Sequence, residues 1–316
     1  MINRILLRIK IVQILYAYYK SDMQSVEKAE KELFFSIEKA YDLYFYLLLL
    51  IVRLTSYAEE RMNKKKQMLT ASVEDKNPST RFVENRFAVQ LTANKELLAY
   101  TERQKISWEQ HNELIKELYD AITASEIYSQ YMQNEKDSYQ NDKEVWRMIF
   151  KKTLSESEIL GKELEEISIY WNDDSETIMS FILKTIKQFD ENSGDSQPLL
   201  PMFKDDEDRE FVKELLRNSI YNEKEYKELI SEHTKNWEVD RLAFMDSIIM
   251  QAALAEIHSF PSIPVNVTMN EYIEIAKSYS TAKSSTFVNG ILDSIVDKLR
   301  KDNKIIKVAY YTPTVK

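Results

Sequence analysis

Residues 284–301 read SSTFVNGILDSIVDKLRK, and the spacing of their apolar side chains decides the fold class. From Phe287 to Leu299 these side chains recur at intervals of three and four residues, which places them along one face of a helix. The same spacing of apolar side chains also occurs before this stretch and predicts further helices there. In the last third of the chain we expect helices at about 205–221, 223–236, 239–258, 268–281 and 284–301.

Composition extends the helical prediction to the whole chain. The 316 residues include only 3 glycines and 6 prolines. Sheets joined by tight turns need such residues at many points, so the sequence predicts an all-α protein. No cysteine occurs, which excludes disulfides and thiolate zinc sites.

The chain divides at a stretch that contains Gly194, Pro198 and Pro201, the clearest linker in the sequence. Helices are also expected at 3–20 and 25–65. The predicted organisation is a helical core from residues 1–20 and 205–301, a helical insertion at 21–190, a linker at 191–204 and a flexible tail at 302–316.

Charge is distributed unevenly along the chain. The net charge is −9, but residues 1–20 carry +4 and residues 301–316 carry +3. Any surface that binds phosphate must therefore be local. The longest apolar run, Leu43 to Val52, would rise about 15 Å as a helix, roughly half a bilayer core. We expect a cytoplasmic protein with no membrane partner.

Motifs for catalysis are absent from the sequence. It lacks GxGxxG, P-loop, GxSxG and HExxH patterns, and its three histidines are isolated, so we expect no enzyme activity, no cofactor and no metal. The run Lys64-Lys65-Lys66, with Arg61, has two interpretations that stay open here. It is either a solvated helix end or a nucleic-acid contact.

Two local features of the last third need explanation. Gly290 lies inside a helical pattern, where glycine costs about 1 kcal/mol relative to alanine. We expect another helix or a ligand to approach closely there. Thr268-Met-Asn-Glu271 matches a capping box, which would begin a helix at Thr268.

Three motifs in order resemble the C-terminal signature of NusB proteins: Ile263-Pro-Val-Asn-Val-Thr-Met-Asn-Glu271, Glu274-Ile-Ala-Lys277 and Phe287-Val-Asn-Gly-Ile-Leu-Asp293. Gln13-Ile-Leu-Tyr16 resembles the end of the family's first helix. The resemblance covers about residues 1–20 and 205–300 and implies a NusB-like helical bundle. In that bundle the N-terminal helix completes a core made by the C-terminal third, and residues 21–204 form an insertion.

The resemblance also implies a function. NusB proteins pair with NusE, a small-subunit ribosomal protein, and the pair binds single-stranded boxA RNA in the transcription elongation complex to support antitermination. The residues implied for RNA binding are Arg4, Arg8, Lys10, Gln251, Lys277 and Lys283. Those implied for partner binding are Tyr16 and Asp246, and the signature positions of mainly structural role are Asn270, Glu271, Phe287, Asn289 and Gly290.

The sequence departs from the family pattern at three positions. Gln251 stands where an arginine is common, Ala255 where an aromatic is found, and Lys283 where an acid is frequent. An alternative is therefore a helical protein-interaction module that keeps the core but binds RNA weakly or not at all. A third reading, the RNA-binding appendage of an RNA methyltransferase, fails because the chain leaves no room for a nucleotide-cofactor domain.

Overall fold

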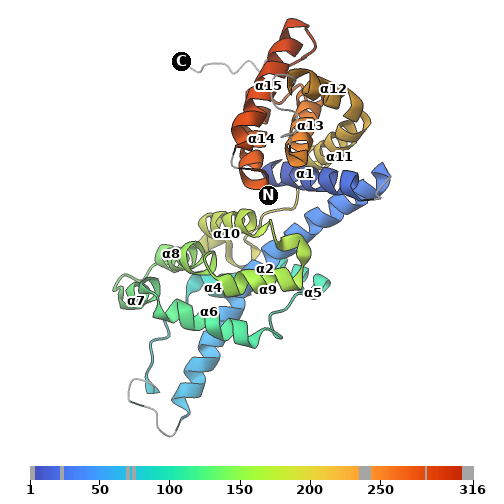
Figure 1. The fold of residues 1–316 in the computed structure, drawn as a ribbon. Helices are drawn as coiled ribbons and strands as arrows, with labels where there is room; N and C mark the ends of the chain where they lie inside the picture. Colours follow the sequence, from blue (N-terminus) through green and yellow to red (C-terminus); the bar gives the residue numbers. More distant parts are fainter. Residues whose placement is uncertain are drawn as a thin grey trace, which may run out of the picture. The chain divides into compact units, whose positions relative to one another are not determined.

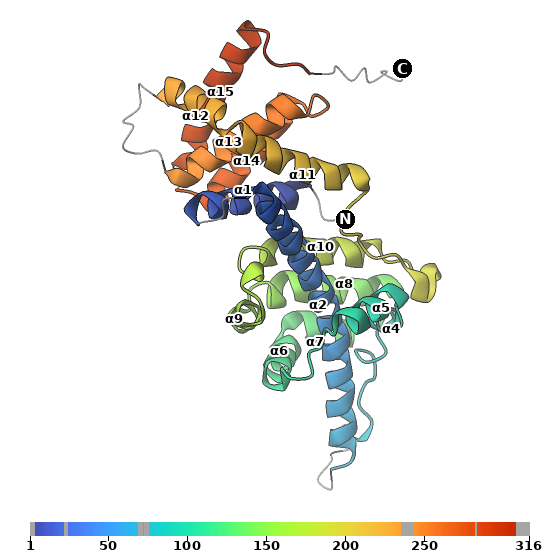
Figure 2. The same ribbon diagram turned by 90° about the vertical axis from the view of Figure 1, so that its right-hand side faces the viewer.

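The protein is described from a computed structural model, which covers residues 4–21, 25–68, 72, 76–234, 243–281 and 283–307. These residues form helices joined by turns, and none of them lies in a strand (Figures 1 and 2). The prediction of an all-α protein is confirmed for them. Contacts divide the chain into a middle unit, residues 38–202, and a terminal unit, the described residues of 2–37 and 203–316.

The terminal unit is built from both ends of the chain. Its helices are α1 (Arg4–Lys20), the start of α2 (Val26–Lys66), α11 (Asp206–Tyr221), α12 (Glu223–Thr234), α13 (Phe244–Ser259), α14 (Val265–Tyr279) and α15 (Ser284–Lys301). α1 packs against α11, α13 and α14. The terminal unit extends to Ile37, past the predicted boundary at residue 20, because Glu30 accepts hydrogen bonds from Arg217 and Phe34 packs on Phe203.

Two helices of the terminal unit are buried on nearly every side. α1 buries an almost unbroken run from Leu6 to Leu15, which includes the charged residues Arg8 and Lys10. α13 is buried from Ile248 to Ile257, so neither helix has the polar face of a surface helix. The core of this unit is therefore formed around α1 and α13.

α14 begins earlier than the capping-box pattern predicted. Its first residue is Val265, directly after Pro264, whose backbone conformation suits a helix start. Thr268 lies inside the helix, and its hydroxyl donates to Glu256 Oε1 at 2.8 Å. The predicted capping box at Thr268 is wrong, because this side chain bonds to a neighbouring helix rather than to its own backbone.

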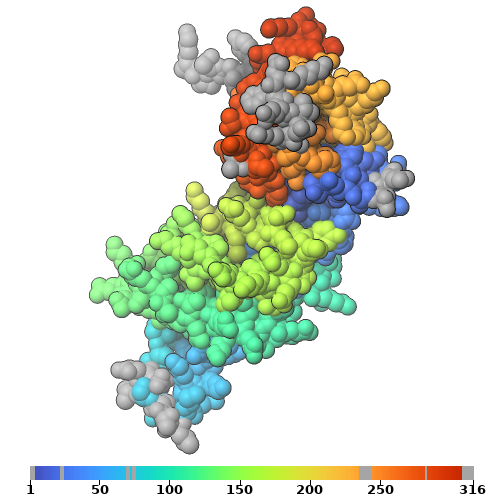
Figure 3. Space-filling view, viewed as in Figure 1, coloured from blue at the N-terminus to red at the C-terminus, as the bar shows by residue number. Residues whose placement is uncertain are grey.

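The middle unit surrounds the rest of α2. Its other helical segments are α4 (Arg86–Thr92), α5 (Lys95–Gln104), α6 (Asn112–Ala124), α7 (Glu126–Gln133), α8 (Tyr139–Ile149), η1 (Phe150–Leu154), α9 (Glu158–Ile167), η2 (Ile169–Trp171), α10 (Ser175–Gln188) and η3 (Glu191–Ser196). Trp108 and Trp171 donate indole hydrogen bonds to the carbonyls of Tyr46 and Lys39 on α2, at 2.9 and 2.7 Å. Side chains of α6 and α9 cover part of α2 in Figure 3.

Residues 191–202, within the predicted linker, pack on the middle unit. Leu199 and Leu200 are buried there. Asn94 Nδ2 donates to the carbonyl of Gln197 at 2.7 Å, and the Tyr44 hydroxyl accepts from the Leu200 N–H at 3.2 Å. Local turn residues predicted a linker, but these contacts hold the segment in place.

Some predictions fall outside the described part of the chain. Residues 235–242, which include the predicted start of the 239–258 helix, and most of the predicted tail, residues 308–316, are not described. Within the tail, Lys307 Nζ donates to the carbonyl of Phe260 at 2.9 Å. None of the described helices is both long enough and apolar enough to cross a membrane.

Candidate nucleic-acid and protein interface

The start of α13 is the meeting point of three other helix ends in the terminal unit. The Phe244 ring contacts the Tyr16 ring edge-on, with centroids 5.4 Å apart, and Lys20 Nζ lies 4.4 Å from the Phe244 centroid. Two residues further on, Asp246 accepts hydrogen bonds from the end of α14 and the start of α15. α1, α14 and α15 therefore converge here (Figure 2). We call the exposed side chains at this end the α13 rim: Tyr16, Lys20, Lys277 and Lys283.

Asp246 holds the turn between α14 and α15. Its carboxylate accepts from Ser280 Oγ at 2.5 Å and from Ser284 Oγ at 2.9 Å. An acidic residue in the first turn of a helix also interacts favourably with the helix dipole. The side chain is buried, and its hydrogen bonds are internal. Asp246 therefore holds the turn between Lys277 and Lys283, and its role in binding a partner stays a prediction.

Arg8 forms a buried ion pair in the centre of the terminal unit. Its Nε and Nη2 donate to Glu256 Oε2 and Oε1 at 2.7 and 2.8 Å, and both residues are at most 3% exposed. Thr268 and Tyr272 donate to the same carboxylate. Burial disfavours the charged guanidinium, but hydrogen bonding and attraction to Glu256 outweigh burial and raise the pKa of Arg8. This arrangement can join α1, α13 and α14, since one carboxylate of α13 accepts hydrogen bonds from donors on α1 and α14.

The residues predicted to bind RNA are divided by burial. Arg8, Lys10 and Gln251 are each no more than 3% exposed. Gln251 Nε2 donates to the Tyr19 hydroxyl at 2.8 Å and to the Ser219 carbonyl at 2.7 Å. None of these three side chains reaches the surface of the described structure, so their burial gives no support to the prediction that they contact RNA.

The other predicted RNA-binding residues reach the surface. Arg4 is partly exposed, donates to Asp208 Oδ1 at 2.8 Å and lies over the Phe211 ring. Lys277 and Lys283 are exposed, and Lys277 Nζ donates to Glu274 at 2.5 Å. Because exposed pairs of this kind are weak, the lysine can exchange its partner for a phosphate. Contact between these residues and RNA stays a prediction.

The signature residues lie mostly on the outside of α14 and α15. Asn270 is exposed, whereas Glu271, Phe287 and Asn289 are half-buried. Glu271 lies 3.8 Å from Arg8 and adds to the surroundings of the buried pair. The signature therefore combines one contact to the core with side chains at the surface.

Gly290 has no close neighbour in the described structure. It is exposed, and a Cβ atom added there would meet nothing within 4 Å. The expectation that another helix of this chain approaches at Gly290 is wrong, because the space beside it is open.

Two residues of this region have contacts that the sequence does not predict. Glu256 had a visible signal, since it is an acid within the apolar segment 248–257, where an unpaired charge would be costly. The sequence shows Lys20 only as one of the basic residues at the N-terminus, because its position over the Phe244 ring depends on the tertiary fold. Within the described residues, no group of three or more histidine, aspartate or glutamate side chains could hold a metal ion.

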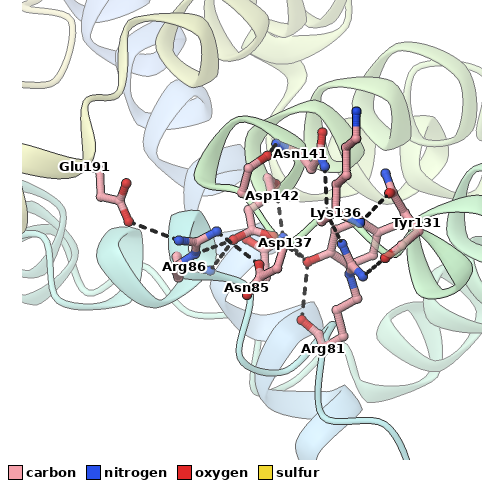
Figure 4. Close-up of polar contacts among 11 residues, drawn as sticks. Arg81, Asn85, Arg86, Tyr131, Lys136, Asp137, Asn141, Asp142 and Glu191 are labelled. Carbon is pink, nitrogen blue, oxygen red and sulfur yellow. Dashed lines mark hydrogen bonds and ion pairs between the residues drawn. The ribbon is translucent and has the colours of Figure 1, made fainter.

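A second polar centre lies in the middle unit (Figure 4). Arg86 donates to Asp142 and Asp137 at 3.0 Å and to Glu191 at 3.3 Å, and the Tyr131 hydroxyl donates to Asp142 at 2.7 Å. The hydrogen bond to Asp142 and its charge are the main reasons why the pKa of Arg86 is raised. Arg86 thus holds three carboxylates, and through Asp142 and Tyr131 the cluster joins α4, α7 and α8.

Comparison with known proteins gives consistent matches. A model of the NusB family matches residues 178–297, a range that begins within α10 and does not include residues 1–20. The transcription antitermination protein NusB of Salinibacter ruber is 34% identical over 132 residues, which are 40% of this chain and 82% of that protein. NusB of Geotalea daltonii is 35% identical over 139 residues, which are 44% of this chain and 93% of that protein. The solved structure of T. maritima NusB is 28% identical, covers 49% of this chain and 91% of that chain, and gives a TM-score of 0.28.

Proposed function

The chain belongs to the NusB family, and from this premise we propose that it is a non-catalytic transcription antitermination factor that binds boxA-type single-stranded RNA together with NusE. The relatives that carry the antitermination name support the first part of this proposal. The observation that carries the second part is the α13 rim: Tyr16 and Lys20 both contact Phe244 at the start of α13, and the exposed Lys277 and Lys283 flank the α14–α15 turn that Asp246 holds two residues further on.

The charge of the rim supports RNA as a ligand. The whole chain has a net charge of −9, so it does not attract nucleic acid in general. At the rim, Asp246 is buried and hydrogen-bonded to two serines, so it adds no exposed charge. The exposed charges are those of Lys20, Lys277 and Lys283, together with the one acid Glu274 that pairs with Lys277. Lysines neutralise phosphates and fix the position of a strand, while hydroxyl and amide groups nearby can meet base edges.

The aromatic part of the rim supports a protein partner. Tyr16 is 38% exposed, packs edge-on against Phe244 and presents both an apolar ring and a hydroxyl group. Tyrosine is enriched in protein interfaces because it combines these two properties. We place the NusE contact at Tyr16 and the RNA contact at the lysines next to it.

The alternative function is a protein-interaction module with weak or no RNA binding. The burial of Arg8, Lys10 and Gln251 favours it, because three positions expected to meet RNA lie inside the core. On this alternative, NusE binding through Tyr16 persists while boxA RNA binds no better than any other strand.

The proposal is tested by binding boxA and scrambled RNA to the full chain, with and without NusE, across a salt series. The variant Lys20→Gln/Lys277→Gln/Lys283→Gln is expected to flatten the dependence of log affinity on log salt by about 2, since each phosphate contact of a single strand contributes about 0.7. The matched control is Lys224→Gln/Lys298→Gln/Lys301→Gln, which removes the same charge from α12 and the far end of α15. Equal binding of both RNAs by the mixture with NusE contradicts the proposal.

A further inference from the structure

A cavity of about 340 Å³ lies in the middle unit beside the last turns of α2. Its walls come from α2, from residues 78–83, and from α6 and α7. This volume falls in the range of about 300–1,000 Å³ that is typical of small-ligand sites. The proposed function does not use this cavity, since the α13 rim belongs to the terminal unit.

One wall of the cavity is aromatic. Phe82, Tyr119 and Tyr128 line it, together with two methionines. The Phe82 ring is buried and packs edge-on against Tyr128, with centroids 5.2 Å apart, while both tyrosines are only half-buried. Half-exposed rings braced by a buried ring form a firm surface on which a planar group can stack.

The rim of the cavity is basic. Arg61 and Lys65 line it, and the exposed residues Lys64 and Lys66 are their neighbours at the end of α2. Among the described residues, no acidic side chain is paired with any of these lysines. Asp120 also lines the cavity, but its carboxylate is paired with the Arg61 guanidinium. The local charge therefore stays positive within a chain whose net charge is −9.

Arg61 is held in place by its neighbours. Its guanidinium lies 5.9 Å from the ring centroid of Tyr57 and 5.6 Å from that of Tyr119, in addition to its pairing with Asp120. Cations at a helix C-terminus are explained by the helix dipole alone. The dipole does not explain why these cations border a cavity with an aromatic wall.

We propose that this cavity binds nucleotide units of single-stranded RNA, with a base against the tyrosine wall and the adjoining phosphates at Arg61 and the Lys64–Lys66 run. Stacking on aromatic rings beside positive charge is how proteins bind single strands without strong sequence preference. The site gives the NusB-family chain a second RNA contact, on the unit that the family signature does not cover. It does not depend on the boxA and NusE assignment, because its probe is a strand of uridines alone.

The test measures binding of fluorescein-labelled decauridylate to the full chain without NusE. Tyr128→Ala is expected to weaken binding about 5- to 150-fold, while Tyr128→Phe, which keeps the ring, changes it less than about twofold. Lys64→Gln/Lys65→Gln is expected to flatten the salt slope by about 1.4. Lys151→Gln/Lys152→Gln removes equal charge from exposed lysines of η1 that do not line the cavity, and it should leave the slope unchanged.

A second readout needs no variant. Photocrosslinking with 5-bromouridine-substituted decauridylate is expected to join the strand to peptides that contain Phe82, Tyr119 or Tyr128. Crosslinks that map only elsewhere overturn the proposal, as does a Lys64→Gln/Lys65→Gln variant that behaves like its control. Uridine monophosphate that competes as strongly as the strand overturns RNA as the ligand in favour of a free nucleotide. A decaglutamate peptide that competes as strongly overturns it in favour of an acidic protein segment.

Discussion

Replacing Arg8 by alanine tests the buried pair at the centre of the terminal unit. The substitution leaves the Glu256 carboxylate, which is 0% exposed, without the two charged hydrogen bonds that it accepts at 2.7 and 2.8 Å. Breaking a buried pair by removing one partner costs about 3–5 kcal/mol. That is a large part of the roughly 5–15 kcal/mol that stabilises a folded domain.

Hydrogen exchange of peptides from α1, α13 and α14 is the suitable assay. A single unfolding midpoint is not well defined for a chain with two compact units, whereas exchange reports the stability of the terminal unit separately. We expect Arg8→Ala to accelerate exchange in these peptides by about 100-fold or more, which corresponds to about 3 kcal/mol. Peptides of the middle unit should exchange as in the wild type.

Two controls make this prediction specific. Arg4→Ala removes a partly exposed ion pair to Asp208 and should cost about 1 kcal/mol or less. Arg8→Met/Glu256→Gln removes both charges, keeps an acceptor for Thr268 and should recover most of the lost stability. If Arg8→Ala is no more destabilising than Arg4→Ala but weakens RNA binding, Arg8 lies at the surface and our account of the core is refuted.

Three further predictions concern single side chains. Gly290→Ala should stabilise the terminal unit by about 1 kcal/mol, measured by hydrogen exchange of peptides from α15, because a Cβ meets no atom there; a loss of stability would contradict the open space. Asp142→Ala should destabilise α4, α7 and α8 by about 1.5–3 kcal/mol in hydrogen exchange, because Arg86 and Tyr131 lose their charged acceptor; unchanged exchange would show that the cluster is not stabilising. Burial lowers the pKa of His258 below 6.5, so the wild type should lose stability relative to His258→Gln as the pH falls below about 6.5; equal hydrogen-exchange protection of α13 peptides in the two proteins at every pH would contradict this.

Helix positions in the last third were predictable from apolar spacing. The helix at 284–301 was predicted with the bounds that the structure gives, since its apolar period is unbroken from Phe287 to Leu299. The sequence mispredicts the start of α14 because the Thr268 pattern imitates a capping box, while the helix in fact begins at Val265, directly after Pro264. Local patterns identify a helix more reliably than its first residue.

The candidate site was less predictable than the fold. Basic residues near the N-terminus suggest an RNA-binding surface, yet Arg8 is buried and paired with Glu256. The two residues lie 248 positions apart in the chain, so the pairing forms only in the folded protein. No local pattern shows such a pairing. The linker prediction also rests on local residues alone. Gly194 and Pro198 indicate turns, but they do not show that Leu199 and Leu200 are buried.

The surface character of Gly290 was also hidden from the sequence. Because glycine destabilises a helix, its presence predicts that another group packs closely against this position, but no atom of the described chain lies within 4 Å of a Cβ placed there. The exposed position of Gly290 on α15 leaves that space open on the side of the solvent.

The proposed function requires the α13 rim to bind boxA RNA in the presence of NusE. Photocrosslinking of 5-bromouridine-substituted boxA RNA to the full chain with NusE bound, followed by peptide mapping against a scrambled strand, tests this directly. We expect boxA-dependent crosslinks to peptides at the end of α1 and at the turn between α14 and α15, and their loss in Lys20→Gln/Lys277→Gln/Lys283→Gln. Crosslinks that are identical for both strands, or that avoid these peptides, would contradict it.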